Sequence, residues 1–326
     1  MEIKKVSERS FLIETNGKRF STPFFFPSIS SIKTNFEIED YLNIVQKIDY
    51  PSFLISSYDI NRSKERSQLL TNVSDSTRNR SITLLDSGHY EAYWNEDSSW
   101  HFDNYESVLN EIDVDFCFSF DVFWNPGKKI ESHVDETIKS IAISAGMLKS
   151  GDTIPLLHLP IPELIDTIPK IVQTVCPKII GIPERELGAS LFERALNVKK
   201  IRRLLDSTDQ TVLLHLLGTG NPISILVYSL SGADTFDGLE WCQTVVNPTT
   251  GHLFHFVQKE LLECDCKYCT ANLSYPLQTL GHNLGFMRYF MDQLQESIKE
   301  NDTKTLIENY LALSTIKKLN ALGVLE

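Results

Sequence analysis

The pentapeptide Ile82-Thr83-Leu84-Leu85-Asp86 is a short apolar run that ends in aspartate, and its pattern recurs along the chain. Similar runs follow at intervals of about twenty to forty residues, separated by polar–apolar segments with helical spacing. Eight short strands that alternate with helices are the layout of a (β/α)8 barrel of the TIM type. An open, doubly wound α/β sheet is the alternative, although no G-x-G-x-x-G fingerprint follows the first strand.

Residue type and length define the individual elements of this prediction. The predicted strands are Phe24–Ile29, Phe53–Ser57, Ile82–Asp86, Phe116–Asp121, Pro155–Leu159, Lys178–Ile182, Val212–Leu217 and Ala233–Asp237. The predicted helices between them include Phe36–Ile44, Asp135–Leu148, Leu191–Leu205 and Pro222–Ser231. We expect a catalytic barrel over residues 1–255, a small metal-binding subdomain over 256–290, and C-terminal helices over 291–326 that pack on the barrel.

Length, composition and net charge limit the classes of protein to which the chain can belong. The chain has 326 residues, of which 42% are hydrophobic, so it can bury one large core or two modest ones. No apolar run is long enough to span a membrane and no apolar signal sequence precedes Ser10, so we expect a cytoplasmic protein with reduced cysteines. The net charge of −12 argues against a surface that coats nucleic acid, but it permits a local basic patch. Candidates for phosphate contacts are Lys128, Lys129, Lys199 and Lys200.

Three of the six cysteines lie within Glu263–Thr270, at C-x-C-x2-C spacing. Cys264 and Cys266 are too close along the chain for an easy mutual disulfide. Thiolates that converge in this way suit a tetrahedral zinc ion, which needs one more nitrogen or sulfur ligand. His282 is the one downstream histidine, so we predict a closed, structural Cys3His zinc site of Cys264, Cys266, Cys269 and His282. The alternative is a loop with free thiols.

Three predicted strands end in aspartate, at Asp86, Asp121 and Asp237, and a fourth ends in Gly218-Thr219-Gly220. In a (β/α)8 barrel these ends meet at one mouth, where active sites lie. A single terminal aspartate is also an ordinary helix N-cap. Two carboxylates that flank a glycosidic bond can cleave it, and a third can accept the adjacent N–H donors of guanine. Tyr90 offers an aromatic face for a planar base, or it is simply a rim or core aromatic.

The motifs also resemble those of the tRNA-guanine transglycosylase superfamily, the queuine- and archaeosine-type enzymes that exchange guanine in a polynucleotide for a 7-deazaguanine. The resemblance covers most of the chain in matching order. The segments that carry it are Thr22–Pro27, Leu85–Glu91, Phe120-Asp121, His215–Pro222, Gly232–Asp237 and the cysteine run with His282-Asn283-Leu284.

The resemblance implies a role for each matching residue. Asp237 becomes the nucleophile at C1′ of the target nucleotide and Asp86 the general acid and base. Asp121 would read the purine edge. Ser87, Tyr90, Leu217 and Gly218 would complete the base site. The zinc ion would be structural, and the partners would be a nucleic acid and a 7-deazaguanine base.

Departures from the family pattern bear on which polynucleotide, DNA or tRNA, is the substrate. His89 replaces a glycine and Glu91 a glutamine, no P-T-R follows Asp237, and the interval between Cys269 and His282 is short. These changes favour slightly the divergent branch of the superfamily that inserts deazaguanines into DNA, with tRNA as the alternative substrate.

Two other classes of protein remain open. A non-catalytic partner subunit would have lost the acids that this chain keeps. An unrelated metal-dependent barrel hydrolase would need ligands such as His158 or His215, which are more often satisfied core histidines.

The last helices are predicted over Leu284–Ile298 and Thr303–Leu322, and both carry apolar stripes. These stripes fit either a face that packs on the core or an interface, in a homodimer or with a partner protein.

Overall fold

The computed structural model describes residues 1–79 and 81–325, and its centre is a barrel of eight parallel strands. The strands follow one another in the order β8-β7-β6-β5-β4-β11-β10-β9. A parallel bridge between Leu156 and Gly181 joins the two ends of this sheet, with the Leu157 amide donating to the Gly181 carbonyl at 3.0 Å. The predicted (β/α)8 architecture is therefore confirmed.

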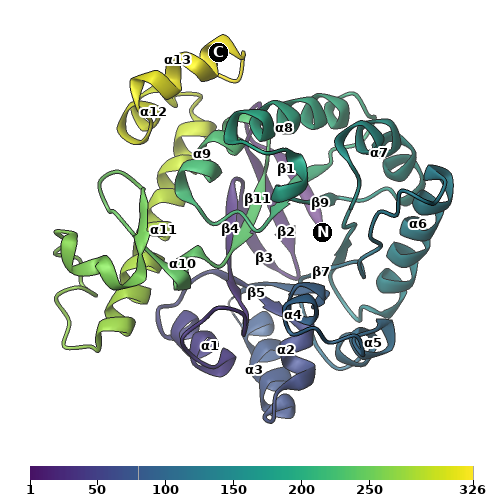
Figure 1. The fold of residues 1–326 in the computed structure, drawn as a ribbon, viewed down its shortest axis with the longest axis horizontal. Helices are drawn as coiled ribbons and strands as arrows, with labels where there is room; N and C mark the ends of the chain where they lie inside the picture. The colour runs from purple at the N-terminus through teal and green to yellow at the C-terminus, as the bar shows by residue number, and fades with distance from the viewer. Residues whose placement is uncertain (80, 326) are drawn as a thin grey trace.

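Helices surround the strands in a ring, as Figure 1 shows. The barrel strands are β4 (Phe24–Ile29), β5 (Ser52–Ser56), β6 (Ile82–Asp86), β7 (Phe116–Phe118), β8 (Asp152–Ile154), β9 (Ile179–Pro183), β10 (Leu213–Leu217) and β11 (Thr235–Gly238). The helices are α1 (Ile38–Lys47), α2 (Ser57–Arg62), α3 (Arg66–Asn79), α4 (His89–Trp94), α5 (Phe102–Leu109), α6 (Ile130–Met147), α7 (Ile161–Val175), α8 (Leu191–Asp206), α9 (Pro222–Ser231) and α10 (Glu240–Gln243), with a 3-10 turn η1 (Glu184–Leu187).

Alternation along each strand divides the apolar side chains between two cores. One core fills the barrel and the other lies between the strands and the helices. In β6, for example, Ile82 and Leu84 belong to the interior, whereas Leu85 packs toward the helices. The inward series ends in polar residues at the carboxyl ends, where Asp86 follows the inward Leu84 and Asp237 follows the inward Thr235.

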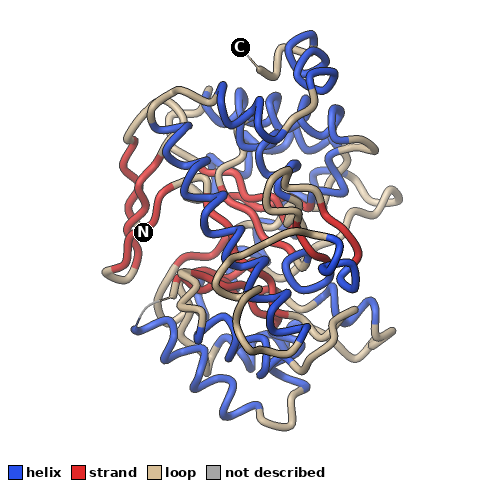
Figure 2. Tube along the Cα trace, turned by 90° about the vertical axis from the view of Figure 1, so that its left-hand side faces the viewer, coloured by secondary structure: helices blue, strands red, loops and turns tan. Residues whose placement is uncertain are grey.

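The amino-terminal end of the barrel is closed by a three-stranded antiparallel sheet of β1 (Glu2–Lys5), β2 (Phe11–Thr15) and β3 (Lys18–Ser21). Figure 2 shows these strands standing on one side of the molecule. Phe11, Ile13 and Phe20 enter the barrel core, and the Phe20 ring lies 4.4 Å from that of Phe24. The open end of the barrel is therefore the carboxyl end.

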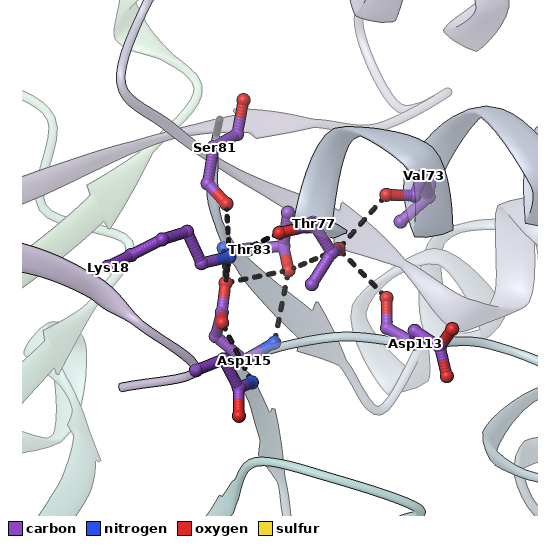
Figure 3. A network of polar contacts seen from close by, with 8 residues as sticks. Lys18, Val73, Thr77, Ser81, Thr83, Asp113 and Asp115 are labelled. Carbon is purple, nitrogen blue, oxygen red and sulfur yellow. Dashed lines mark hydrogen bonds and ion pairs between the residues drawn. The ribbon is translucent and has the colours of Figure 1, made fainter. Parts of the chain in front are cut away.

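A buried polar network fastens this sheet to the barrel (Figure 3). The Lys18 ammonium donates to the Thr77 carbonyl at 2.6 Å, to the Ser81 carbonyl at 2.7 Å, and to the Asp115 carboxylate. Asp115 has no exposed surface and also accepts the Thr83 amide at 2.9 Å. The charge of the Asp115 carboxylate, which water does not reach, is thus matched by a cation and by hydrogen bonds.

The segment after β11 forms the region of the cysteine cluster and the last helices. It contains β12 (Thr244–Val246), β13 (Leu253–His255), the 3-10 turn η2 (Phe256–Leu261), α11 (Tyr275–Lys299), α12 (Lys304–Tyr310) and α13 (Leu313–Ala321). The cysteine loop packs closely on α11, because a Cβ at Gly281 would lie only 2.6 Å from the Tyr268 ring. No helix among the described residues is both long and apolar enough to cross a bilayer.

Some predicted boundaries differ from the structure. The predicted strand Pro155–Leu159 lies just after β8, which occupies Asp152–Ile154, and only its first residues bond across to Gly181. The predicted strand Phe116–Asp121 ends at Phe118. α11 is continuous from 275 to 299, so one helix crosses the predicted boundary at residue 290, and the division into domains stays an interpretation.

Candidate functional site

A cavity of about 1240 Å³ opens at the carboxyl ends of the strands. Asp86 reaches it from the end of β6, Asp121 from the segment after β7, and Asp237 from β11. The other predicted base-binding residues also line it, namely Ser87, Tyr90, Leu217 and Gly218. Side chains that are far apart in the sequence therefore share one pocket, as expected from the ends of barrel strands.

Asp237 is held in a fixed orientation by three donors. Ser28 donates its hydroxyl to one carboxylate oxygen at 2.8 Å. The other oxygen lies 3.0 Å from His215 Nε2 and 3.2 Å from the Gly218 amide. Gly218 adopts φ +72°, a left-handed conformation that turns its N–H toward the carboxylate. Asp237 is 7% exposed, so a small open face meets the cavity.

Asp86 lies in an environment that favours its neutral form. Burial raises its pKa well above the usual value, and the nearby charges of Glu91, Asp121 and Asp237 raise it further, although the Gly88 amide opposes this by donating at 2.9 Å. The side chain keeps some exposure to the cavity. Asp86 can therefore carry a proton near neutral pH and deliver it within the pocket.

Asp121 lies in the opposite electrostatic environment. Burial raises its pKa, but His158 and Ser87 outweigh this effect, so the pKa is held below the usual range. His158 Nε2 lies 2.8 Å from one oxygen, and Ser87 donates its hydroxyl to the other. Asp121 thus stays ionised in the pocket, with lone pairs still available to accept N–H groups.

His158 bridges two carboxylates. Its Nδ1 lies 2.7 Å from Glu186, while Nε2 faces Asp121. Burial lowers the pKa of His158, but the two carboxylates more than reverse this and raise it to about 9. The imidazolium is therefore the stable form near neutral pH, and it supplies the charge that keeps Asp121 ionised.

Glu91 is a further buried acid beside the pocket. Its two oxygens accept hydroxyl hydrogen bonds from Ser30 at 2.5 Å and from Ser56 at 2.7 Å. Burial raises its pKa. Glu240, which also lines the cavity, has its pKa raised by burial to about 7. The site consequently gathers more carboxyl groups than the three that strand ends identify.

His89 occupies the position where the family motif has a glycine. Its ring packs against Phe120 and Phe123, with ring centroids 4.5 and 5.1 Å away. Burial lowers its pKa, and its Nε2 is buried without a hydrogen-bond partner among the described residues. A ligand in the cavity would meet a neutral imidazole here.

Sequence reasoning did not assign Glu91 or Glu186 to the site, and it left His158 and His215 as core histidines. A signal for His215 exists, since its place in β10 shares the inward register of Leu213 and Leu217. Strand alternation gives no signal for Glu91, because it lies on α4, and its one signal is its place in Leu85–Glu91, where it replaces a glutamine of the family motif.

Arranged in this way, the pocket can perform chemistry at a bond between a sugar and a base. It combines a fixed carboxylate, a carboxyl group held neutral and a third carboxylate held ionised. A neutral acid can protonate a leaving base while a carboxylate attacks the anomeric carbon. The ionised carboxylate can orient a purine by accepting adjacent N–H groups.

The predicted metal ligands also converge. The thiol sulfurs of Cys264, Cys266 and Cys269 lie 3.4, 3.7 and 3.5 Å from His282 Nδ1. A tetrahedral zinc ion with ordinary bond lengths would set these separations at about 3.6 Å. His282 Nε2 lies 2.8 Å from the Val246 carbonyl, which leaves Nδ1 for a metal. The four residues could hold one metal ion.

The four lysines predicted to contact nucleic acid do not line the cavity. Lys128 pairs with Glu136 at 2.9 Å, and Lys129 immediately precedes α6. Lys199 donates to the Gly323 carbonyl, and Lys200 to the Asn197 amide oxygen at 3.2 Å. Their role in binding nucleic acid stays a prediction.

Comparison with known proteins adds an independent observation. No family model matches the chain. Among characterised proteins, a tRNA-guanine(15) transglycosylase of Sulfolobus acidocaldarius is 22% identical over 316 residues, which cover 89% of this chain and 61% of that protein. The chain thus spans about three fifths of the length of that relative. The resemblance inferred from the motifs is therefore confirmed as a similarity, over most of the chain, to a protein that bears a tRNA-guanine transglycosylase name.

Proposed function

We propose that the chain is a guanine transglycosylase, a pentosyltransferase that exchanges guanine in a polynucleotide for a 7-deazaguanine base. The observation that carries this proposal is the meeting of Asp86, Asp121 and Asp237 in one cavity, each in a different electrostatic environment. The relative from Sulfolobus acidocaldarius, whose name states this class of activity, supports it.

In the proposed reaction, Asp237 is the nucleophile. One of its oxygens bonds to C1′ of the target nucleotide while the bond from C1′ to guanine N9 breaks. Asp86 protonates the departing guanine and becomes a carboxylate. The incoming deazaguanine then gives its N9 proton to Asp86, and N9 bonds to C1′ as the ester to Asp237 breaks. The bond is exchanged without net hydrolysis, which requires that water be kept away from the intermediate.

Asp121 is the proposed reader of the base. Its ionised carboxylate would accept the N1–H and 2-amino hydrogens of guanine, a pair of donors that adenine lacks on that edge. His158 and Ser87 occupy one direction on each oxygen and so orient the group. Tyr90, which is 38% exposed, would stack on the base, and Leu217 and Gly218 would form the opposite wall.

We assign zinc to the Cys3His cluster, with Cys264, Cys266 and Cys269 bound as thiolates. Such a closed site would be structural. A chain of contacts connects it with the nucleophile. Asn283, next to the ligand His282, donates to the Trp241 carbonyl at 2.8 Å, and the Trp241 indole donates to the Ser28 carbonyl at 2.8 Å. Ser28 in turn holds Asp237.

The identity of the polynucleotide substrate is a finer part of the proposal. DNA is slightly favoured over tRNA, because Glu91, His89 and the short interval between Cys269 and His282 depart from the pattern of the tRNA enzymes. Since the relative carries a tRNA-specific name, tRNA is the alternative.

The direct test is base exchange by Asp237→Asn. Purified protein is incubated with labelled guanine and, separately, with bulk tRNA or duplex DNA, and label in each polymer is counted. We expect the unmodified chain to label one polymer and to form a denaturant-resistant adduct with it, and Asp237→Asn to do neither. Asp209→Asn, which changes an exposed aspartate, is the matched control. Exchange that survives Asp237→Asn at full rate would refute the nucleophile, and no label in either polymer would count against the activity.

A further inference from the structure

Three large aromatic side chains are exposed at the mouth of the cavity. Tyr93 is 74% exposed, Trp94 47% and Phe123 51%, and all three line the opening. We refer to Tyr93, Trp94 and Phe123 as the aromatic rim. Large apolar side chains that remain in water and gather at one opening usually mark a binding surface.

The rim is a connected surface. Tyr93 and Trp94 adjoin at the end of α4, with ring centroids 5.6 Å apart, and Trp94 lies 6.4 Å from the Tyr90 ring inside the cavity. Phe123 comes from the segment after β7 and packs against His158, which borders the proposed base site, at 4.7 Å. A path of aromatic faces therefore leads from the pocket to the surface.

Two cations flank this path. The Lys33 ammonium lies 3.8 Å from the centre of the Trp94 ring, and Arg185 lines the cavity on the opposite strand end, after β9. Both side chains are exposed, and neither forms an ion pair with any of the described residues. Of the nearby acids, Asp97 is neutralised by Arg62 at 2.7 Å, whereas Glu96 is exposed at the same opening.

The ligand that matches this surface is a strand of unpaired nucleotides. A base that enters the cavity must leave its stack, and its neighbours lose a stacking partner. Aromatic side chains can replace that partner for any base, and adjacent cations can contact the phosphates between the bases. A rim that read paired DNA or RNA would instead present hydrogen-bonding groups to a groove.

We propose that the aromatic rim is a stacking platform for the unpaired nucleobases that flank the target guanine in a single-stranded segment of nucleic acid. Lys33 and Arg185 contact the adjoining phosphates. The inference rests on the proposed function, because the target base is the one that enters the cavity. It goes further than that function, because it specifies the conformation of the bound nucleic acid. The segment is locally single-stranded, whether the polymer is DNA or RNA.

Binding is tested without turnover in the Asp237→Asn variant. Fluorescently labelled single strands with one guanine, as DNA and as RNA of the same sequence, are titrated and followed by anisotropy. We expect the Tyr93→Ala/Trp94→Ala double variant to bind both strands about tenfold more weakly or worse. Tyr289→Ala, which removes a 60% exposed tyrosine from α11, is the matched control and should bind as the parent does.

Further variants separate stacking from misfolding. Trp94→Phe keeps an aromatic face and should retain most of the affinity, and Phe123→Ala tests the rim from a different segment. A rim variant that binds single strands as tightly as the parent would overturn the platform. So would a parent that binds duplex DNA more tightly than either single strand. Tight, rim-dependent binding in a protein that exchanges no base would contradict the proposed function but support the stacking platform.

Discussion

Single side chains in the pocket differ chiefly in the charges that surround them. Asp86 has carboxylates as neighbours and an elevated pKa, whereas Asp121 has the His158 imidazolium and a depressed one. One group is thereby prepared to give a proton and the other to accept N–H groups. The same residue type can serve two roles because burial and neighbouring charge, and not residue identity, set the proton affinity.

Glu91→Gln should move the pH profile of base exchange. Asp86 acts as an acid only while it is protonated, so activity should persist at neutral pH and fall as the pH rises through its elevated pKa. Glu91 is one cause of that elevation, and glutamine keeps partners for Ser30 and Ser56 without the charge. We expect the alkaline limb of kcat/KM to shift to lower pH.

The control for this shift is Glu96→Gln. Glu96 lines the same opening but is exposed, so solvent screens its charge and the profile should not move. An alkaline limb that stays in place in Glu91→Gln would mean that the proton of Asp86 does not limit the reaction.

His158→Gln should change how stability depends on pH. The folded pKa of about 9 lies above the unfolded value of 6.5, so the histidine stabilises the fold fully below about pH 6.5 and loses this contribution as the pH rises through 9. The full contribution is about 3 kcal/mol. Urea unfolding at pH 6, 8 and 10 should therefore show a smaller decline in the variant.

His252→Gln is the matched control, because His252 is exposed and lies outside the cavity. It should follow the parent at each pH. If His158→Gln declined with pH as steeply as the parent, the imidazolium between Asp121 and Glu186 would be excluded.

The aspartates could be found from the sequence, but their partners could not. Asp86 follows directly from strand alternation as the polar end of the inward series Ile82 and Leu84, and Asp237 follows from its place at the end of an apolar run. His158 lies in a segment where the strand prediction was shifted past β8, and Glu91 lies on a helix. Which face of α4 meets the pocket depends on how this helix packs on the barrel, and no local sequence pattern encodes that packing.

Among the elements, the β2–β3 hairpin shows how a local signal can be overlooked. Asn16-Gly17 joins two strands, with both residues at positive φ, as a two-residue type I′ turn requires. Phe11, Ile13 and Thr15 alternate inward before it. The turn and the alternation together predict a hairpin, but they do not show what its apolar face packs against. In the structure this face closes the amino-terminal end of the barrel.

Lys18→Met should destabilise the protein by about 3 kcal/mol, because it leaves the buried Asp115 carboxylate without its cation. Arg19→Met, one residue along, breaks an exposed pair with Glu14 and should cost less than about 1 kcal/mol. Urea unfolding at neutral pH compares the two variants. Equal losses would show that the buried polar network of Lys18 and Asp115 adds nothing beyond a surface ion pair.

The region of the cysteine cluster should depend for its stability on the proposed zinc ion more than on its own apolar core. Its turn η2 leaves Val257 and Leu261 largely exposed, at 67% and 74%, so little apolar area is buried there. We expect the purified protein to contain one zinc ion, and Cys266→Ser to lose most of it and to unfold at a lower temperature. Exchange activity should also fall, through the contacts from Asn283 to Ser28.

Cys176→Ser is the control, since Cys176 is an exposed thiol at the end of α7. It should keep both the metal and the melting temperature. Full zinc content in Cys266→Ser, measured by elemental analysis, would place the metal elsewhere.

For the whole molecule, the question is how a chain with net charge −12 attracts a polyanion. Long-range repulsion between the acidic protein and the polyanion opposes the approach of nucleic acid, so affinity has to come from short-range contacts at the cavity mouth. Tyr93, Trp94 and Phe123 supply contact area that salt does not screen, while Lys33 and Arg185 supply two local charges. Such a surface would favour strands with unstacked bases over duplex, which offers mainly phosphates.

The salt dependence of binding distinguishes the rim from the lysines that the sequence indicated. For single strands, each phosphate contact contributes about −0.7 to the slope of log K against log salt concentration. Contacts by Lys33 and Arg185 alone predict a slope of about −1.4, and full engagement of Lys128, Lys129, Lys199 and Lys200 as well would bring it to about −4. We expect the shallow slope, and we expect Lys33→Gln/Arg185→Gln to flatten it further while Lys128→Gln/Lys129→Gln leaves it unchanged. A steep slope that the second pair reduces would assign the nucleic acid to the lysines outside the cavity.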